Sequence, residues 1–324
     1  MVVELVSGAI NWDTSIFVEK FPEAKEEVRA KKVISVPGGK GANVAIASAR
    51  ILGPNDVGII GALGDDDIAE RQIEILQREG INTSSIRRIK NTGSGQAYVV
   101  IDSTAENFII TYKAANNMIS ADIVSDDITS NLLKTCKLIT VIDPPLEVAE
   151  AIINMARDLN KTVLWSPGLL ARNGFEKLRE IMMKVNYVIL NESEAMILAG
   201  MDDAVKACQT LSDRMNGKKV IGTLGARGCI LCWQTKTATI PAPNPQDLGL
   251  QIVNTVGAGD AFVGAFSALK IKEFGDMESL FLANIAGALK TTREETRGSS
   301  TYKEIRQYFD DKRVQSLFNK ISVV

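Results

Sequence analysis

The sequence predicts an α/β fold in which a central, mostly parallel sheet is flanked by helices and a small second sheet lies to one side. Two observations predict it. Short apolar runs alternate with helical patterns along most of the chain, which is typical of parallel strands joined by crossover helices. Two regions without a helix interrupt this alternation. Because no linker, low-complexity tract or internal repeat is visible, we predict a single α/β domain over residues 1–324.

The strands of the central sheet are predicted from short apolar runs bounded by turn residues, beginning with "VELVSGAI". We expect them at 3–10, 57–64, 138–143, 162–167, 187–191 and 219–225. The longer segments between these runs place apolar residues on one face of a helix. We expect helices at 41–52, 66–79, 146–159, 202–215, 258–272 and 276–292.

The small sheet is predicted from residues 12–37 and 95–113. The first region has strand-like pieces, and the second reads as a hairpin with a turn near "STAEN", residues 103–107. Neither region contains a helix that could cross over, so their strands should form a small, mostly antiparallel sheet outside the main one. We expect residues 12–37 and 93–113 to act as a lid. Ordinary antiparallel strands at the edge of the main sheet are the alternative.

The charge balance disfavours several kinds of partner. The 37 basic and 39 acidic side chains leave a net charge of −2, so no overall field draws the molecule to nucleic acid or to a membrane. The first residues lack the basic region of a secretory signal, and no apolar run approaches the roughly 18 residues of a membrane span. We therefore expect a cytoplasmic protein with small-molecule partners.

The cysteines are expected to be plain buried side chains. Four of them are too few and too scattered for a disulfide framework. The "CILC" segment has the spacing of a zinc or redox site, but the chain has no histidine and no second cysteine pair to complete four ligands. A strand would also point Cys229 and Cys232 to opposite faces.

Polar and glycine-rich segments follow several predicted strands. Ligands in open α/β sheets bind at the carboxyl ends of the strands, so a site is expected there. The segments are "NWD" at 11–13, "PGGKGAN" at 37–43, "NESE" at 191–194, "TLGARG" at 223–228 and "NTVGAGD" at 254–260.

Two common phosphate-binding motifs do not match these glycines. A Walker A loop needs Ser or Thr after its lysine, whereas Lys40 is followed by Gly41. A dinucleotide fingerprint needs three spaced glycines after the first strand, and Val44 stands where the third would follow Gly39 and Gly41. The sequence therefore gives little support to the hypothesis of a nicotinamide-dependent enzyme.

The "GAGD" segment suits transfer of a phosphoryl group. Glycines 257 and 259 allow several N–H groups to converge at a helix amino terminus, where the helix dipole also favours negative charge. Asp260 would repel an anion there, so it makes sense as a general base that accepts a proton from an attacking alcohol. Because the chain has no histidine, a carboxylate is the expected base. Taken alone, the pattern fits a helix cap equally well.

Taken together, the five segments resemble the motifs of the ribokinase family, the PfkB-type carbohydrate kinases. "NTVGAGDAFVGA" is similar to the family's carboxyl-terminal signature and "GGKGAN" to its amino-terminal one. "GAINWD", "NESE" and "TLGARG" occur in the family's order, so the resemblance runs from about residue 5 to about residue 300. It implies a ribokinase-like fold with a small β-sheet lid.

The resemblance implies roles at the acceptor end. Asp260 matches the base that deprotonates the sugar's primary hydroxyl, and the amides of Gly257, Ala258 and Gly259 match the anion hole. Lys40 is a candidate phosphate clamp; a solvated lysine at a helix start is the favoured alternative. The candidate substrate-binding residues are Asn11, Asp13, Gly39, Lys40, Asn43 and Asp143.

The resemblance also implies ATP and Mg²⁺. Asn191 and Glu194 match the pair that holds Mg²⁺ through water, and Thr223, Gly225 and Asn284 match nucleotide contacts. Asn254 stands where many ribokinases have an aspartate that helps to bind an activating cation such as K⁺. Its neutral amide disfavours this activation.

Two further departures concern the pocket. "NVAIASARILG" is about one residue longer than the family's pattern, and "AAN" at 114–116 replaces its "GAN". The expected function is ATP-dependent phosphorylation of the primary hydroxyl of a pentose, with D-ribose to ribose 5-phosphate first. The alternatives are a nucleoside kinase for adenosine or cytidine, another PfkB-type sugar or sugar-phosphate kinase, and a catalytically silent sugar-binding protein. The family's lid implies a homodimer.

Overall fold

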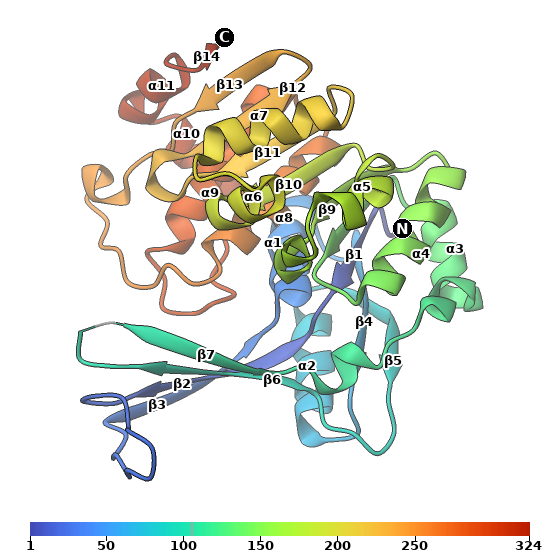
Figure 1. Ribbon diagram of the computed structural model, residues 1–324, viewed down its shortest axis with the longest axis vertical. Coiled ribbons are helices and arrows are strands. Elements are labelled where there is room, and N and C mark those ends of the chain that lie inside the picture. The colour runs from blue at the N-terminus through green and yellow to red at the C-terminus, as the bar shows by residue number, and fades with distance from the viewer. Residues whose placement is uncertain (105) are drawn as a thin grey trace.

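A ten-stranded sheet runs through the middle of the molecule (Figure 1). The structure is a computed structural model, and it describes residues 1–104 and 106–324. Strands β11 through β5 are parallel, whereas the last three strands at one edge are antiparallel. The order is β14 (Ser322–Val323), β13 (Lys236–Ile240), β12 (Cys229–Trp233), β11 (Lys219–Thr223), β10 (Tyr187–Asn191), β9 (Thr162–Ser166), β8 (Leu138–Ile142), β1 (Glu4–Gly8), β4 (Val57–Leu63) and β5 (Asn82–Arg88).

Helices cover both faces of this sheet and build one apolar core on each. One face carries α1 (Lys40–Leu52), α2 (Asp67–Arg78), α8 (Ala258–Ile271), α9 (Asp276–Lys290), α10 (Tyr302–Phe309) and α11 (Lys312–Phe318). The other carries α3 (Asp127–Thr135), α4 (Leu146–Asp158), α5 (Phe175–Met182), α6 (Glu192–Ala199) and α7 (Ala204–Arg214). The central strands are buried on both sides, which explains why they read as unbroken apolar runs.

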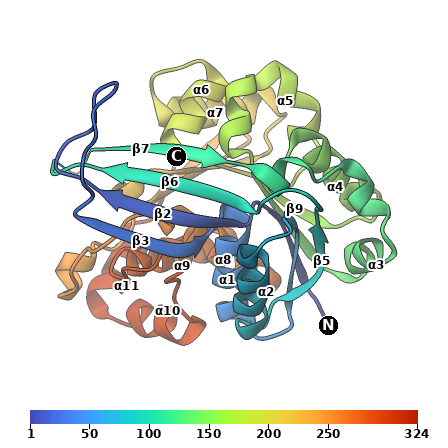
Figure 2. The ribbon, with the colours of Figure 1, turned by 90° about the horizontal axis from the view of Figure 1, so that it is seen from below.

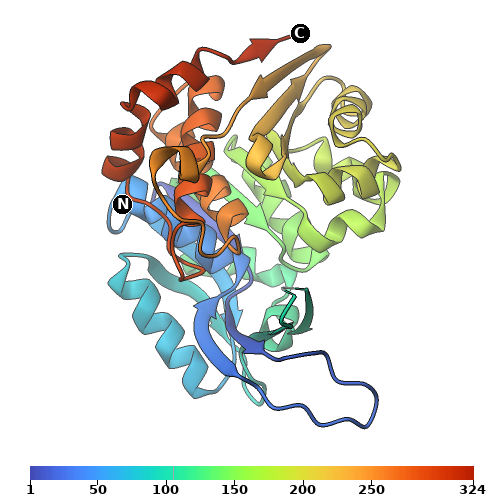
Figure 3. The ribbon, with the colours of Figure 1, turned by 90° about the vertical axis from the view of Figure 1, so that its left-hand side faces the viewer.

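A separate four-stranded sheet projects from the body beside β1 (Figures 1 and 2). Its order is β3 (Lys32–Gly38), β2 (Asn11–Phe17), β6 (Gly95–Ile101) and β7 (Asn107–Tyr112). Figure 3 shows the loop between β2 and β3 extending beyond the body. The two outer pairings are antiparallel, but β2 pairs with β6 in parallel. This is possible because the chain passes through α1, β4, α2 and β5 between them, so the two strands need no tight hairpin.

The two faces of this small sheet carry different residues, and neither is uniformly polar, since Ile34, Val99 and Ile109 lie on the same face as Asp13. Directly paired residues point to the same face, so Asp13, Ala97 and Thr111 share one face with Asn11. The opposite face carries mostly apolar side chains, among them Trp12, Ile16, Val33, Tyr98, Val100, Phe108, Ile110 and Tyr112.

The predicted elements of the main sheet are confirmed within a few residues, and the small sheet is a separate one rather than an edge of the main sheet. The structure adds elements that we did not predict. Strand β5 reads "NTSSIRR", and as an edge strand with a polar sequence it gives no apolar signal. The expected turn at 103–107 includes residue 105, which lies outside the described residues. The other added elements are α3, α5, α6, α10, α11 and β12 to β14.

The cysteines behave as expected. All four are buried free thiols, and burial raises the pKa of Cys229. Cys229 and Cys232 lie in β12 and pack into the cores on opposite faces of the sheet. In the described part of the chain, no helix has the length and apolar character needed to cross a bilayer.

Candidate active site

A cavity of about 300 Å³ opens where the small sheet approaches the carboxyl ends of β10 and β11. We call it the Asp260 cavity. It collects side chains from the first turns of α1 and α8 and from the face of the small sheet that carries Asn11 and Asp13. Its lining includes Asn11, Asp13, Gly39, Lys40, Asn43, Ala97, Asn191, Glu194, Thr223, Gly257, Gly259, Asp260 and Thr296.

A second cavity of about 320 Å³ adjoins the first, and Thr223 and Gly259 line both. We call it the Asn284 cavity. Apolar side chains and glycines make up most of its wall, which suits a flat ring better than a group with many hydroxyls. Its lining includes Gly225, Ala242, Pro243, Ile252, Ala258, Phe262, Asn284, Gly287 and Ala288. The two cavities therefore meet beside Gly259.

Asp260 lies in the first turn of α8, and its carboxylate faces the Asp260 cavity. Its Oδ2 accepts a hydrogen bond of 2.7 Å from Nδ2 of Asn43. Burial raises the pKa of Asp260, and the bond from Asn43 and the charge of Lys40 oppose the rise. The cap position of α8 is Gly257, which has no side chain, so Asp260 does not serve as a helix cap.

The amino terminus of α8 presents main-chain N–H groups beside Asp260. Gly257 has φ 87°, and a Cβ there would overlap the carbonyl oxygen of Thr296, so only glycine fits. The N–H of Ala258 donates to Thr255 O at 3.2 Å. Within the described chain, the N–H groups of Gly257, Gly259 and Asp260 have no main-chain acceptor. Two of the three predicted hole amides are therefore free to meet an anion.

The residues of the small sheet are held in place by their neighbours. Gly39 has φ 94°, and a Cβ on it would come within 2.5 Å of the main-chain nitrogen of Asn11. This close approach brings the start of α1 against β2. Asn116 then donates from Nδ2 to Oδ1 of Asn11 at 2.9 Å and so orients that amide.

Arg297 is a buried cation that the sequence did not indicate. Its Nε donates to Oδ1 of Asn43 at 3.1 Å, and its Nη2 donates to Gly38 O. It therefore orients the same Asn43 that contacts Asp260. No local pattern marks this role, because Arg297 and Asn43 are 254 residues apart.

Asp13 is a carboxylate whose ionisation costs stability. Burial raises its pKa from the usual 3.8 to about 6, although the charge of Arg297 opposes the rise. Its Oδ1 has no hydrogen-bond partner among the described residues. The folded protein thus holds this proton more tightly than the unfolded chain does, so stability is lost as the pH rises from 3.8 to about 6.

We therefore expect Asp13→Asn to increase the free energy of unfolding at pH 8 by about 1–3 kcal/mol. The gain should shrink toward pH 4, where the wild-type carboxyl is protonated in the folded state. Urea denaturation at both pH values measures the difference. Asp65→Asn, at an exposed position, is the control. An Asp13→Asn protein that is less stable than the wild type at pH 8 would contradict the expectation.

Asn191 and Glu194 form a capping box at the start of α6. Oδ1 of Asn191 accepts the N–H of Glu194 at 2.8 Å, and Oε2 of Glu194 accepts the N–H of Asn191 at 3.1 Å. Both residues also line the Asp260 cavity. The box uses only Oε2 of Glu194, so Oε1 is available to a ligand. The spacing "NxxE" thus has a structural function of its own.

The other predicted residues divide between the two cavities and their surroundings. Lys40 is half-buried and lines the Asp260 cavity, so it is not a fully solvated lysine. Asn284 is buried, and its Nδ2 donates to Ile240 O at 3.0 Å, which leaves its carbonyl oxygen as the free polar atom. Neither Asp143 nor Asn254 lines either cavity. Asp143 has φ 56° and lies beside Gly168, near Lys40.

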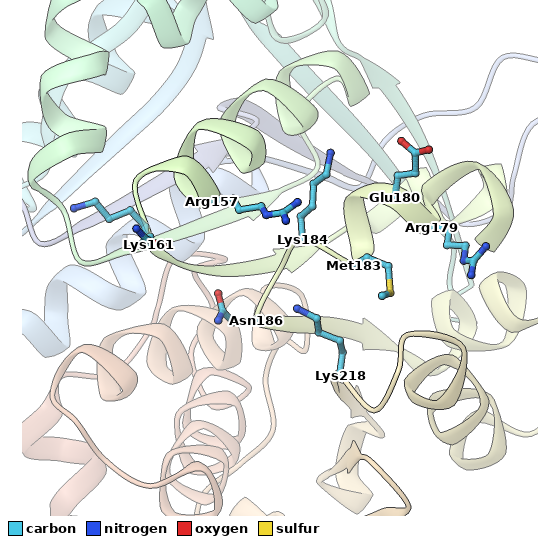
Figure 4. A pocket seen from close by; sticks show the side chains of 9 residues that line it. Arg157, Lys161, Arg179, Glu180, Met183, Lys184, Asn186 and Lys218 are labelled. Atoms are coloured by element: carbon cyan, nitrogen blue, oxygen red, sulfur yellow. The ribbon is translucent and has the colours of Figure 1, made fainter.

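A larger cavity, about 710 Å³, lies elsewhere, at the amino ends of β9, β10 and β11 (Figure 4). Its basic side chains are spread around the rim rather than directed to one point (Figure 4). Three of them are engaged by the protein: Lys161 donates to Lys134 O, Lys184 to Asn154 Oδ1, and Lys218 to Val185 O. Among its described lining residues, this cavity has no acid beside the free N–H groups of a helix amino terminus, unlike the Asp260 cavity.

Comparisons with known proteins point to one family. The model of the "pfkB family carbohydrate kinase" matches residues 5–302. The chain is 29% identical over 314 residues to a deoxyribokinase of Salmonella typhi, which covers 94% of this chain and 96% of that protein. It is 28% identical over 302 residues to a ribokinase of Haemophilus influenzae, which covers 91% and 94%. A solved structure of Arabidopsis thaliana ribokinase complexed with ribose and ATP matches with a TM-score of 0.83 at 23% identity, over 96% of this chain and 99% of that one.

Proposed function

This chain belongs to the pfkB family of carbohydrate kinases, and we propose that it transfers the γ-phosphoryl group of ATP to the primary hydroxyl of a pentose, with D-ribose as the first candidate. Its fold is ribokinase-like, and as a sugar kinase of this family it is a phosphotransferase that acts on an alcohol. The sugar and the roles of individual residues are our proposals.

The observation that carries the proposal is the position of Asp260 in the Asp260 cavity, directly after Gly259, which lines both cavities. A sugar in the Asp260 cavity would contact the polar side chains of Asn11, Asp13 and Asn43, which can each pair with a hydroxyl. A nucleotide in the Asn284 cavity would place its base against the apolar wall. Its phosphates would then pass Gly259 and reach the amides at the start of α8.

The proposed reaction needs little covalent chemistry from the protein. Asp260 accepts the proton of the primary hydroxyl while the hydroxyl oxygen forms a bond to the γ-phosphorus and the bond to the ADP oxygen breaks. The amides of Gly257 and Gly259 hold the negative charge on the phosphoryl group. Asn43 keeps the carboxylate of Asp260 oriented through its hydrogen bond.

We propose that Glu194 and Asn191 hold Mg²⁺ through water. Mg²⁺ prefers oxygen ligands and keeps several waters, so one available carboxylate oxygen facing the cavity fits this mode. A bound Mg²⁺ supplies neutralisation of the charge on the β- and γ-phosphates. The described residues hold no cluster of three or more acidic, cysteine or histidine side chains for a directly bound metal.

The experiment that tests the function is a panel of acceptors with Mg-ATP: ribose, 2-deoxyribose, other pentoses, fructose 6-phosphate, 2-keto-3-deoxygluconate, adenosine and cytidine. Coupled detection of ADP gives kcat/KM for each. We expect ribose to have the highest value. 2-Deoxyribose belongs in the panel because one relative is a deoxyribokinase. Turnover with nucleosides alone would replace the ribose assignment, and sugar binding without turnover would favour a silent sugar-binding protein.

We propose that the small sheet is a lid and that it pairs with its copy in a homodimer. The face that carries Asn11 and Asp13 lies over the Asp260 cavity and would exclude water, which could otherwise take the phosphoryl group. The sheet's opposite face leaves Val33, Ile110 and Tyr112 more than half exposed. Such a gathering of exposed apolar side chains suits burial against a second copy. Because ATP is the donor, we also propose a cytoplasmic location.

Ile110→Lys is expected to convert the homodimer into a monomer. The side chain is 56% exposed in β7 on the face opposite Asp13, and a lysine there would place a charge in the proposed interface. Sedimentation velocity measures the mass. Ile109→Lys is the matched control, since Ile109 is 60% exposed on the same strand but points to the other face. If both variants keep the mass of the wild type, this face is not the interface.

A further inference from the structure

Lys290, the last residue of α9, is a lysine with a fully buried side chain, 0% exposed. Its ammonium donates hydrogen bonds to the carbonyls of Asn254 at 3.0 Å and Arg293 at 3.3 Å. The nearby ion pair between Arg293 and Glu304 uses another cation, and no ion pair in the described chain includes Lys290. A buried ammonium without a paired carboxylate is costly, and burial lowers the pKa of Lys290 to about 8.

The two carbonyls belong to segments that meet at the start of α8. The N–H groups of Val253 and Asn254 both donate to Thr291 O, at 2.8 and 3.0 Å. Nδ2 of Asn254 donates to Glu294 O at 2.7 Å. The two hydrogen bonds of Lys290 add to these contacts between residues 253–254 and 291–294. Lys290 therefore holds the segment that leads directly into Gly257 and the free amides of α8.

The charge of Lys290 acts on the proposed base, Asp260. It lowers the pKa of Asp260, and Asp260 in turn opposes the fall in the pKa of Lys290. Helices α8 and α9 pack against each other (Figure 2), and the bond from Lys290 to Asn254 O places this positive charge beside the segment that leads into the amino terminus of α8. A fixed positive charge there favours the negative charge that develops on a transferring phosphoryl group.

The residues do not fit a monovalent metal ion at Asn254. Oδ1 of Asn254 already accepts the N–H of Val256 at 3.0 Å, and its main-chain carbonyl accepts the ammonium of Lys290. A second cation at these oxygens would meet the positive charge of Lys290 at close range. An ammonium and K⁺ are both bound by carbonyl oxygens, so one can stand in for the other.

We propose that Lys290 is a positioning residue whose ammonium serves as a built-in cation, so that this protein needs no added monovalent metal ion. The inference rests on the proposed kinase function. Lys290 ties the segment 253–257 to residues 291–294 and supplies the charge near the amides that a bound K⁺ would otherwise supply.

The first test uses the wild-type protein in KCl and in choline chloride at equal ionic strength. We expect the same kcat and the same thermal midpoint in both salts. A severalfold higher kcat in KCl, or a midpoint that rises with K⁺ but not with choline, would overturn the inference. The thermal measurement needs no substrate. Absence of turnover in every salt would therefore refute the kinase function while this readout still tests Lys290.

The second test removes the ammonium. Lys290→Met and Lys290→Ala are expected to lower kcat about 10–100-fold with a smaller change in KM for the sugar. Added K⁺ or ethylammonium should raise both the kcat and the thermal midpoint of Lys290→Ala, because the emptied space exposes the two carbonyls. The exposed Lys303→Met is the control and should respond to neither ion. A Lys290→Met protein with wild-type kcat would overturn the inference. If this variant does not fold, the comparison of salts on the wild type decides.

Discussion

Asp260→Asn is expected to lower kcat by at least about three orders of magnitude while leaving sugar affinity within a few-fold of the wild type. A positioned general base contributes about 10²–10⁴-fold, and here the chain offers no histidine to replace it. The amide can still accept the hydrogen bond from Asn43, so the shape of the cavity should be preserved. Steady-state kinetics give kcat, and calorimetric titration with the sugar gives Kd.

The matched control is Asp143→Asn. Asp143 is also an acid whose pKa burial raises and also lies near Lys40, but it does not line the Asp260 cavity. Its replacement should therefore affect kcat far less. If Asp260→Asn turns over within tenfold of the wild type, another group accepts the proton. If it loses sugar affinity as strongly as turnover, Asp260 binds the ground state rather than acting on the reacting hydroxyl.

The pH dependence of the wild type adds an independent check. Burial raises the pKa of Asp260, and the base must be ionised to accept a proton. We therefore expect kcat to fall on the acidic side. Asp13 has a pKa of about 6, so KM for the sugar should also rise below this pH if its ionised form holds a hydroxyl.

The strands of the main sheet could be predicted because burial on both faces requires runs of apolar residues, and such runs are visible in the local sequence. The polar edge strand β5 could not, because half of its environment is solvent. The same distinction holds in the site. The first turn of α8 is a local pattern, whereas the contact that separates a base from a cap joins Asn43 and Asp260 across 217 residues.

The predicted metal pair and the missed cations show the limits of reading motifs. Asn191 and Glu194 are three residues apart, and the same spacing builds a capping box, so the pattern alone cannot tell binding from helix initiation. Arg297 and Lys290 follow no motif. Their partners are main-chain carbonyls and the amide oxygen of Asn43. Every residue has a main-chain carbonyl, so the sequence of the partner segments does not reveal these contacts.

Gly259→Ala is expected to keep the fold and to lower kcat about 10²-fold, because the methyl group would displace the reacting groups. A Cβ on Gly259 would meet no atom within 4 Å, and Gly259 lines both cavities, so the new methyl group would project into the junction between them. That junction is where the phosphoryl group must pass in the proposed reaction. Alanine is favoured over glycine in a helix by up to about 1 kcal/mol, so the thermal midpoint should stay equal or rise.

Gly257→Ala, two residues earlier, is expected to lower the stability of the protein. Its φ of 87° and the overlap of a Cβ with the carbonyl of Thr296 force the start of α8 to shift, so both the thermal midpoint and kcat should fall. Comparing the two variants separates a blocked junction from a damaged helix start. A Gly259→Ala protein with near wild-type kcat would mean that the phosphoryl group does not cross the junction of the two cavities, because a methyl group at this position fills space that the transfer requires.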